Sequence, residues 1–301
     1  MTAHDIASGL MARPRRNGKG WLVLCPVHGD KHPSLSVRDG EDGKLLVKCF
    51  SGCDSREILR TLRDMRLLGG SPLRPVEPPK PEKPVNRADL LNRLWEEAHP
   101  IEPGGLVACY MKCRGIELST WSPDLREHLN LLVYEDGKQT GQRFPAMLSV
   151  IRNVEGCPCG LHITFINEDG SGKAGIDSPR RIIGAKEGST RGGCVRFMEP
   201  KDGTIGLAEG IETALSAYLL TGTSCWAALT AGGIERAELP EDIRKVFLFA
   251  DRDTAGLKAA ANACERFRNE GRESEILAPD NWKSDFNDIL RTNKNAQSVA
   301  S

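Results

Sequence analysis

A proline-rich segment divides this chain into two parts that must fold separately. Residues 69–86 read GGSPLRPVEPPKPEKPVN and hold six of the 18 prolines of the 301-residue chain, with few apolar residues between them. Proline fixes φ and removes an amide donor, so this segment cannot form a helix or a central strand. We therefore expect a semi-rigid linker over 69–86 that follows a small domain over 1–68.

Four potential zinc ligands lie within the small first domain. Two residues separate Cys25 from His28, twenty follow, and three separate Cys49 from Cys53. Zn²⁺ binds four thiolate or imidazole ligands in a tetrahedron, and two short-spaced pairs on turns can supply them. The residues between the pairs read as two strands joined by a glycine-containing turn, which is typical of a zinc ribbon. A domain this small has little core of its own, so we expect structural zinc.

Charge is distributed unevenly, although the chain as a whole is neutral. Residues 1–80 carry 14 basic and 9 acidic side chains, whereas residues 206–301 carry 11 and 15. A basic first domain favours binding to a polyanion, and Trp21 and Phe50 could stack on the bases of single-stranded DNA. The acidic end could collect metal ions.

The rest of the chain predicts a multidomain α/β and α+β fold. Helical spacing covers 87–99 and 105–116, and strand-like runs dominate from 129 to 198. From 204 onward strands alternate with helices, which predicts a mostly parallel sheet. We expect an α+β subdomain over 87–203, an α/β domain over 204–292 and a tail over 293–301. Because no signal peptide or membrane helix is apparent, we expect a cytoplasmic protein without a membrane partner.

Carboxylates follow two of the expected parallel strands. Glu209 ends the strand IGLAE, while Asp251 and Asp253 end VFLFAD and the turn after it. The carboxyl ends of such strands gather functional groups at one edge of the sheet. Acids that converge there repel one another unless a hard cation lies among them, so we expect Mg²⁺ or Mn²⁺.

Two further pairs of residues could serve the same edge. Asp285 and Asp288 in SDFNDIL could add ligands to the metal site, and Gly232 and Gly233 follow the intervening strand. Glycines at such a turn let the backbone approach a phosphate closely.

Several of these segments resemble known families. LAEGIETALS, ADRDTAGLKAA and DFNDIL look like successive motifs of the Toprim domain. CPVH and KCFSGC resemble the zinc ribbon of DnaG-type primases, and YMKCRGI resembles the segment that opens their polymerase core. HITFINEDGSGKAG and PRRIIG are similar to the middle region of short primases from phages and mobile elements. A zinc ribbon combined with Toprim indicates a primase rather than another Toprim enzyme.

The resemblance implies a DNA primase that makes short oligoribonucleotide primers on single-stranded DNA. Its substrates would be the template and nucleoside triphosphates, and a replicative helicase would be supplied in trans. Asp251 and Asp253 would hold Mg²⁺, and Glu209 would complete the coordination or act as a general base. Two alternatives stay open: a Toprim metal-dependent nuclease, and an inactive accessory protein that binds single-stranded DNA in replication or conjugation.

A basic stretch over 173–196 would then grip the template or the triphosphate. Its expected contacts, with Arg114 added from the YMKCRGI motif, are Lys173, Arg180, Arg181 and Lys186. Arg180 and Arg181 are the preferred pair because arginine forks match phosphate geometry.

Two local features depart from the patterns of the larger primases. Three residues separate Cys49 from Cys53, where those primases usually have two. Larger primases carry an aspartate four residues after the first Toprim glutamate, where this chain has Thr213. Glu212 could compensate, or it could simply cap or solvate its helix.

Cys157, Cys159 and His162 could form a second metal site, but buried thiols are the favoured interpretation.

Overall fold

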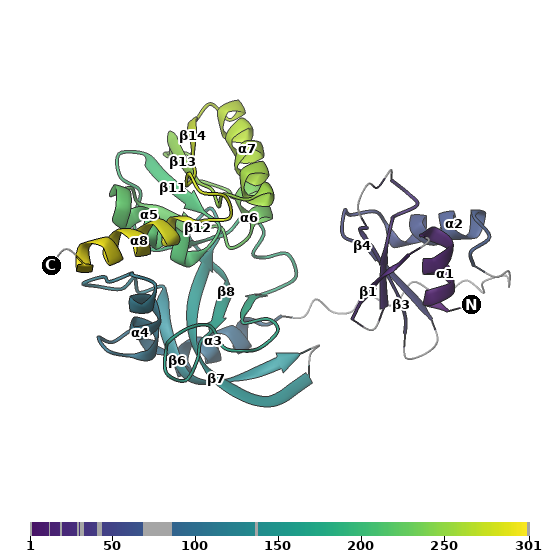
Figure 1. The fold of residues 1–301 in the computed structure, drawn as a ribbon, viewed down its shortest axis with the longest axis horizontal. Coiled ribbons are helices and arrows are strands. Elements are labelled where there is room, and N and C mark those ends of the chain that lie inside the picture. The colour runs from purple at the N-terminus through teal and green to yellow at the C-terminus, as the bar shows by residue number, and fades with distance from the viewer. Residues whose placement is uncertain are drawn as a thin grey trace. The chain divides into compact units, whose positions relative to one another are not determined.

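The computed structural model describes residues 2–11, 13–18, 20–28, 30, 33–40, 44–68, 86–135 and 138–299. The linker expected over 69–86 lies outside the described residues except for Asn86. Internal contacts divide the chain into two compact units, residues 1–81 and 82–301. Figure 1 labels the elements of each unit.

The first unit packs two helices against a small antiparallel sheet. Its strands are hydrogen-bonded in the order β1-β2-β3-β4. Neither helix was predicted from the sequence, although α1 has a capping box between Thr2 and Asp5. Ile6 from α1 and Ile58 from α2 are fully buried against Leu35 of the sheet. The elements are α1 (Ala3–Leu10), β1 (Arg15–Asn17), β2 (Gly20–Val23), β3 (Leu35–Asp39), β4 (Leu45–Cys49) and α2 (Ser55–Asp64).

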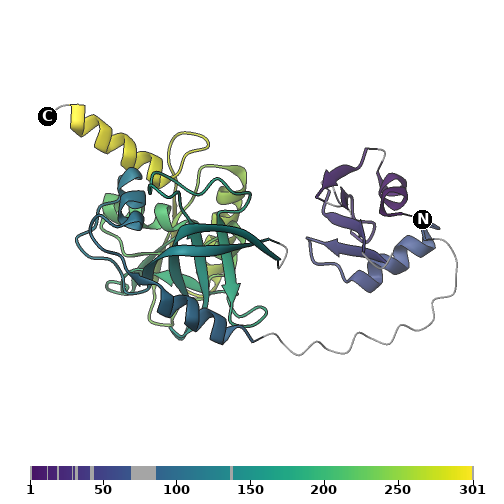
Figure 2. The ribbon, with the colours of Figure 1, turned by 90° about the horizontal axis from the view of Figure 1, so that it is seen from below.

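In the described part of the second unit, ten strands form one sheet and six helices pack with it. Figure 2 shows this sheet and its helices from a second direction. Its first half comprises α3 (Ala88–Glu97), β5 (His99–Pro100), α4 (Leu106–Cys113), β6 (Leu125–Glu135), β7 (Lys138–Arg152), β8 (Pro158–Phe165), β9 (Arg180–Gly184) and β10 (Cys194–Arg196). Its second half comprises β11 (Thr204–Ala208), α5 (Ile211–Thr221), β12 (Cys225–Ala227), α6 (Ala231–Arg236), β13 (Lys245–Phe249), α7 (Thr254–Asn269), β14 (Glu273–Leu277) and α8 (Phe286–Val299).

The sheet changes from antiparallel to parallel along its width. Its main path is β14-β13-β11-β12-β10-β7-β6-β5, and β8 and β9 branch from β7. The pairs β11–β12, β11–β13 and β13–β14 are parallel, whereas β10 joins β12 to β7 through two antiparallel pairings. The regions expected as separate subdomains, 87–203 and 204–292, therefore share one continuous sheet.

Each face of the sheet carries its own layer of helices. One core joins α4, α5 and α8 to one face, with Tyr110, Ile211 and Phe286 buried against Met147. On the other face α6 and α7 cover the parallel strands, with Phe267 buried there. Helix α3 packs by Leu91 and Trp95 on the antiparallel strands of that second face. The ends of β11 and β13 therefore lie between the two layers of helices.

The expected multidomain α/β and α+β architecture is confirmed, with one difference at its end. Helix α8 continues past residue 292, where the α/β domain was expected to give way to a tail. Within the part of the chain that the structure describes, no helix has the length and apolar character needed to cross a membrane.

Candidate zinc site and carboxylate site

The four expected zinc ligands come together in the first unit. Cys25 follows β2, Cys49 ends β4, and Cys53 precedes α2, while His28 lies in the turn after Cys25. Their ligand atoms all lie within 4.8 Å of one another. Thiolate and imidazole in this number suit a tetrahedral zinc ion. The first unit thus carries a Cys/His group that fits a zinc ribbon.

A carboxylate that sequence reasoning missed orients the histidine. His28 Nδ1 lies 3.0 Å from Cys53 Sγ, and His28 Nε2 lies 2.6 Å from Asp30 Oδ1. The other oxygen of Asp30 accepts the amide of Cys25 at 2.9 Å. A histidine that binds metal through one ring nitrogen commonly donates the other N–H to a carboxylate, as this geometry allows. The signal in the sequence was an acid two residues after the histidine.

The local backbone favours a thiolate at one ligand. Burial opposes ionisation of Cys49, but the amides of Cys53 and Ser51 outweigh it and lower the pKa of Cys49 to about 6. Burial raises the pKa of Cys25 and raises that of Cys53 to about 12. Zinc binding would release the protons of these two thiols.

The two aromatic residues of the first unit differ in their surroundings. Trp21 is half-buried: the His4 ring lies tilted against it at 4.7 Å, and the Arg16 guanidinium lies over it at 4.4 Å. Phe50 is 62% exposed, and Lys48 lies over its ring at 5.9 Å. Of the two rings, only Phe50 presents an open face to a nucleic-acid base.

In the second unit, the carboxylates end neighbouring parallel strands, as expected. Glu209 directly follows β11, and one residue separates Asp251 from the end of β13. Asp253 is the N-cap of α7 and accepts the Gly256 amide at 2.7 Å. A Cβ on Gly256 would lie 2.6 Å from the carbonyl oxygen of Asp251, so the first turn of α7 can approach this strand end only through glycine.

Asp251 has the most perturbed carboxylate of this group. Burial, followed by the charges of Asp285, Glu209 and Asp253, raises its pKa to about 7. Its Oδ1 atom is buried and has no hydrogen-bond partner among the described residues. A buried oxygen without a donor is costly unless a cation or proton compensates it. The side chain is therefore suited to a metal ion.

Glu209 and Asp285 flank this position. Burial is the main cause that raises the pKa of each. The positive charge of Arg180 acts in the opposite direction and lowers the pKa of both Glu209 and Asp251. Among the described residues, these acids do not form a group as tight as the zinc ligands.

Asp288 has a structural role in this arrangement. Its Oδ2 accepts the amide of Asp285 at 3.2 Å, and Asp285 Oδ1 accepts the amide of Asp288 at 2.9 Å. This reciprocal capping box begins α8 and holds Asp285 beside the site. The expected metal ligand Asp288 is exposed and engaged in the cap.

Glu212 neither caps nor solvates its helix, in contrast to the simpler expectation. It is 7% exposed and accepts a short hydrogen bond from the Tyr110 hydroxyl. Lys173 Nζ lies 3.3 Å and Arg114 Nε 4.0 Å from its Oε1 atom. Burial opposes ionisation, but Lys173 and the Tyr110 hydrogen bond outweigh it and lower the pKa of Glu212 to about 2.

The cations around Glu212 are less well compensated than the acid. Burial lowers the pKa of Lys173. The negative charge of Glu212 acts to raise it, but the positive charges of Arg180 and Arg114 oppose Glu212. Arg114 Nε is buried without a hydrogen-bond partner. Asn287 anchors Arg114 by donating to its carbonyl at 2.7 Å, and it also donates to Ser216 at 3.0 Å.

The remaining expected phosphate contacts are dispersed. Arg180 and Arg181 are neighbours in β9, but Arg181 lies over the Phe165 ring at 5.4 Å, on the face that packs against α3. Adjacent strand residues point to opposite faces, so the two guanidinium groups do not act as one fork. Lys186 is exposed in the turn after β9.

The glycine turn does not offer an open amide at Gly233. Its N–H is bonded to the Thr230 side chain at 2.8 Å, and a Cβ there would meet the Ala228 carbonyl oxygen at 1.9 Å. The atoms nearest to a Cβ on Gly232 would be those of the Arg236 guanidinium group, at 2.7 Å and beyond. The close backbone approach at Gly233 serves the start of α6.

Cys157, Cys159 and His162 do not group as metal ligands within the residues that the structure describes. The favoured interpretation, buried thiols, holds for Cys159, whereas Cys157 is exposed. His162 is buried on β8, and burial lowers its pKa to about 4.

Comparisons with solved structures give similarities at low identity. A primase from Aquifex aeolicus, with zinc-binding and RNA polymerase domains, is 18% identical with a TM-score of 0.47, covering 100% of this chain and 82% of that chain. A DNA primase domain from Pseudomonas aeruginosa is 16% identical with a TM-score of 0.43, covering 70% and 76%. The primase fragment of the bacteriophage T7 primase-helicase is 11% identical with a TM-score of 0.40, covering 92% and 98%. No curated protein matches the chain.

Two families match the second unit. Residues 85–197 match a family described as a domain of unknown function (DUF7146). Residues 204–296 match the family described as the Toprim domain, and this segment holds the parallel strands, Glu209, Asp251 and Asp285. The expectation drawn from LAEGIETALS, ADRDTAGLKAA and DFNDIL is confirmed. The C-terminal segment of this chain is a Toprim domain.

Proposed function

We propose that this chain is a DNA primase that joins nucleoside triphosphates into short oligoribonucleotides on a single-stranded DNA template. The observation that carries the proposal is the buried, unpartnered Oδ1 of Asp251 among the acids of a Toprim domain. A zinc-ribbon-like unit in the same chain supports a primase rather than a nuclease, because it adds a basic surface with an exposed ring at Phe50.

Mg²⁺ or Mn²⁺ fits the carboxylates of the Toprim domain. Asp251 and Asp285 would hold the ion, since hard cations prefer oxygen ligands. Asp253 Oδ1 accepts a hydrogen bond from the Gly256 amide at the start of α7, so this aspartate would contribute to the metal site through its other oxygen. When bound, the ion neutralises phosphate charge and acidifies the attacking hydroxyl.

The reaction forms one bond and breaks one. The 3′-hydroxyl oxygen of the growing strand bonds to the α-phosphorus of the incoming nucleotide, the bond from that phosphorus to the bridging oxygen breaks, and pyrophosphate leaves. The hydroxyl proton passes to Glu209, whose pKa is raised by burial, and then to water. Arg180 would bind the phosphates, because its side chain is exposed and its positive charge acts on the pKa of both Glu209 and Asp251.

The other proposed contacts follow from position. Arg114 and Lys173 would add positive charge near the phosphates, with Glu212 holding both in place. Phe50 would stack on a template base. Zinc would be structural, and a replicative helicase would act as a separate partner.

Primer synthesis by the full chain tests the proposal. The protein is incubated with mixed single-stranded DNA templates, Mg²⁺ and labelled nucleoside triphosphates, and Asp251→Asn is compared with Asp242→Asn. Asp242 is an exposed aspartate before the opposite end of β13, so its variant is a matched control. We expect short labelled oligomers from the wild type and the control, and none from Asp251→Asn.

Two other outcomes would contradict primase activity. Template degradation without new oligomers would establish the nuclease alternative. Zinc-dependent template binding with neither product would favour the inactive accessory protein.

A further inference from the structure

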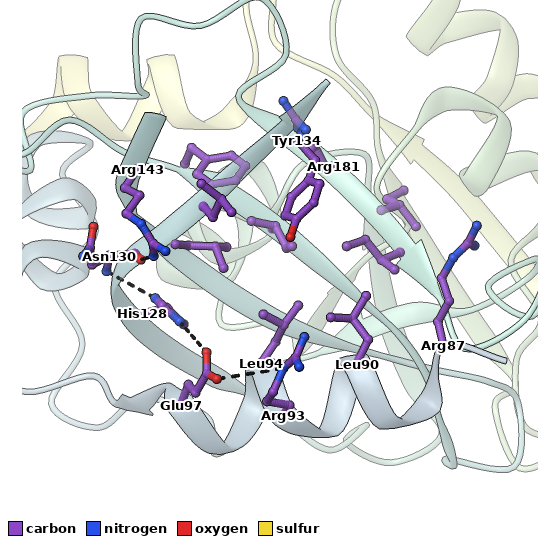
Figure 3. A pocket seen from close by; sticks show the side chains of 16 residues that line it. Arg87, Leu90, Arg93, Leu94, Glu97, His128, Asn130, Tyr134, Arg143 and Arg181 are labelled. Carbon is purple, nitrogen blue, oxygen red and sulfur yellow. Dashed lines mark hydrogen bonds and ion pairs between the residues drawn. The ribbon is translucent and has the colours of Figure 1, made fainter. Parts of the chain in front are cut away.

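A groove separate from the carboxylate site lies between α3 and the antiparallel strands (Figure 3). Its volume is about 610 Å³, and its lining comes from α3, β6, β7, β8 and β9. It lies on the face of the sheet that α3 covers, whereas Tyr110 and Glu212 lie under the helices of the other face. The reaction proposed above uses none of its lining residues, and Arg181 entered only as an expectation from the sequence.

Arginines line both margins of this groove. Arg87 and Arg93 come from the α3 side, and Arg143 and Arg181 come from the sheet side. Figure 3 labels the four and shows them on α3 and on the strands that face it. Among the described residues of the lining, Glu97 is the one carboxylate, and it lies 4.0 Å from Arg93 and 3.4 Å from His128.

The other three arginines have no acidic partner among the described residues. Arg143 donates to the Asn130 carbonyl at 3.0 Å, and Arg181 donates to the Ser178 carbonyl at 3.3 Å. The backbone N–H of Arg87 donates to the Ala185 carbonyl, and its side chain is exposed and could contact a ligand. Each margin therefore carries uncompensated positive charge.

The floor between the margins is aliphatic. Leu90, Leu94 and Ile183 line it half-buried, Ile163 is buried at 2% exposure, and Ile182 at its edge is 43% exposed. Phe165 is 2% exposed and lies beneath Arg181, so Tyr134, at 46% exposure, is the open aromatic ring of the lining. Exposed apolar surface framed by charge is typical of a protein-binding site.

We propose that this groove binds an acidic amphipathic helix from a partner protein. Such a helix presents an apolar stripe with carboxylates along both edges, which matches an aliphatic floor between two arginine margins. Single-stranded nucleic acid fits less well. It carries one line of phosphates and needs open aromatic faces for its bases, whereas the groove has two charged margins and one such ring.

Peptide binding to the full-length protein tests this proposal. The probe is a fluorescein-labelled, amidated peptide of about 16 residues with leucines at i, i+3, i+4 and i+7 spacing and glutamates on both sides of the stripe. A scrambled peptide of the same composition separates amphipathic order from charge alone. Fluorescence anisotropy is measured for the wild type, the double variant Arg87→Glu/Arg143→Glu, and Lys258→Glu. Lys258 is exposed on α7, away from the groove, and controls for the change of charge.

We expect the ordered peptide to bind the wild type and Lys258→Glu alike, and to bind the double variant at least about tenfold more weakly. The scrambled peptide should lose affinity by a similar factor. Equal binding to the double variant, or no binding to the wild type, would overturn the proposal. So would a 16-nucleotide oligothymidylate whose binding depends on Arg87 and Arg143 while the peptide does not bind, because the groove would then be a nucleic-acid surface. Primer synthesis without a partner should be unchanged in the double variant, so this outcome is independent of the proposed function.

Discussion

Replacing Glu212 by glutamine should strongly destabilise the second unit at neutral pH. The side chain is buried, ionised and bonded to Tyr110 and Lys173 across three separate segments of the chain. Glutamine keeps the shape but removes the negative charge that compensates Lys173 and Arg114.

The pKa gives the size of the effect. Lowering it from 4.5 to about 2 corresponds to about 3 kcal/mol of folding free energy. Breaking one partner of a buried ion pair gives about 3–5 kcal/mol. A typical domain is stable by about 5–15 kcal/mol, so the change should be easily measured.

Urea unfolding of the full chain, followed by tryptophan fluorescence, is the assay. Four of the five tryptophans lie after residue 81 and report on the second unit. Glu168→Gln is the control, since Glu168 is exposed on a nearby loop and should change stability by less than about 0.5 kcal/mol.

The pH dependence provides a second reading. Because the folded pKa is depressed, the stabilisation is fully present above pH 4.5 and is lost as the pH falls toward 2. The difference between wild type and Glu212→Gln should thus shrink to roughly half by pH 3. A loss below about 1 kcal/mol at pH 7, or a difference that is constant with pH, would refute the view that Glu212 is a buried carboxylate stabilised by cations.

Three further predictions concern the two sites. Chelation of zinc, or Cys49→Ser, should unfold the first unit while the second keeps its structure, as measured by zinc content and hydrogen exchange; an intact first unit without zinc would contradict a structural metal. Asp30→Ala should lower zinc affinity by about tenfold to a hundredfold in competition with a chelator, and unchanged affinity would exclude its role in orienting His28. Gly256→Ala should lower both the melting temperature and the rate of primer synthesis, because its Cβ would meet the Asp251 carbonyl oxygen at 2.6 Å. An unaltered melting temperature and rate would show that α7 can shift freely.

The sequence was most informative where chemistry and spacing are local. Two short-spaced pairs predicted that Cys25, His28, Cys49 and Cys53 converge, because strand hairpins bring such pairs together. Strand ends followed by acids predicted that Asp251 would lie beside Glu209, because parallel strands share an edge.

The parts that were missed depend on distant contacts. Tyr110 and Glu212 are 102 residues apart, and only the packing of α4 against α5 makes them neighbours.

Other features that were missed are local. The opposite directions of Arg180 and Arg181 could have been predicted, since alternation is a property of any strand. The first-unit helices were missed although Thr2 and Asp54 are good N-caps.

Strand β10 has a consequence for how this chain can be divided. It bonds β7 on one side and β12 on the other, so the stretches 85–197 and 204–296 meet within one hydrogen-bonded ladder. A cut between residues 197 and 204 would leave bare strand edges on both fragments, and such edges recruit other chains. The two fragments, expressed alone, should aggregate, and they should be rescued by co-expression. Modular exchange of the Toprim segment alone between proteins would therefore require a host that supplies its own β10.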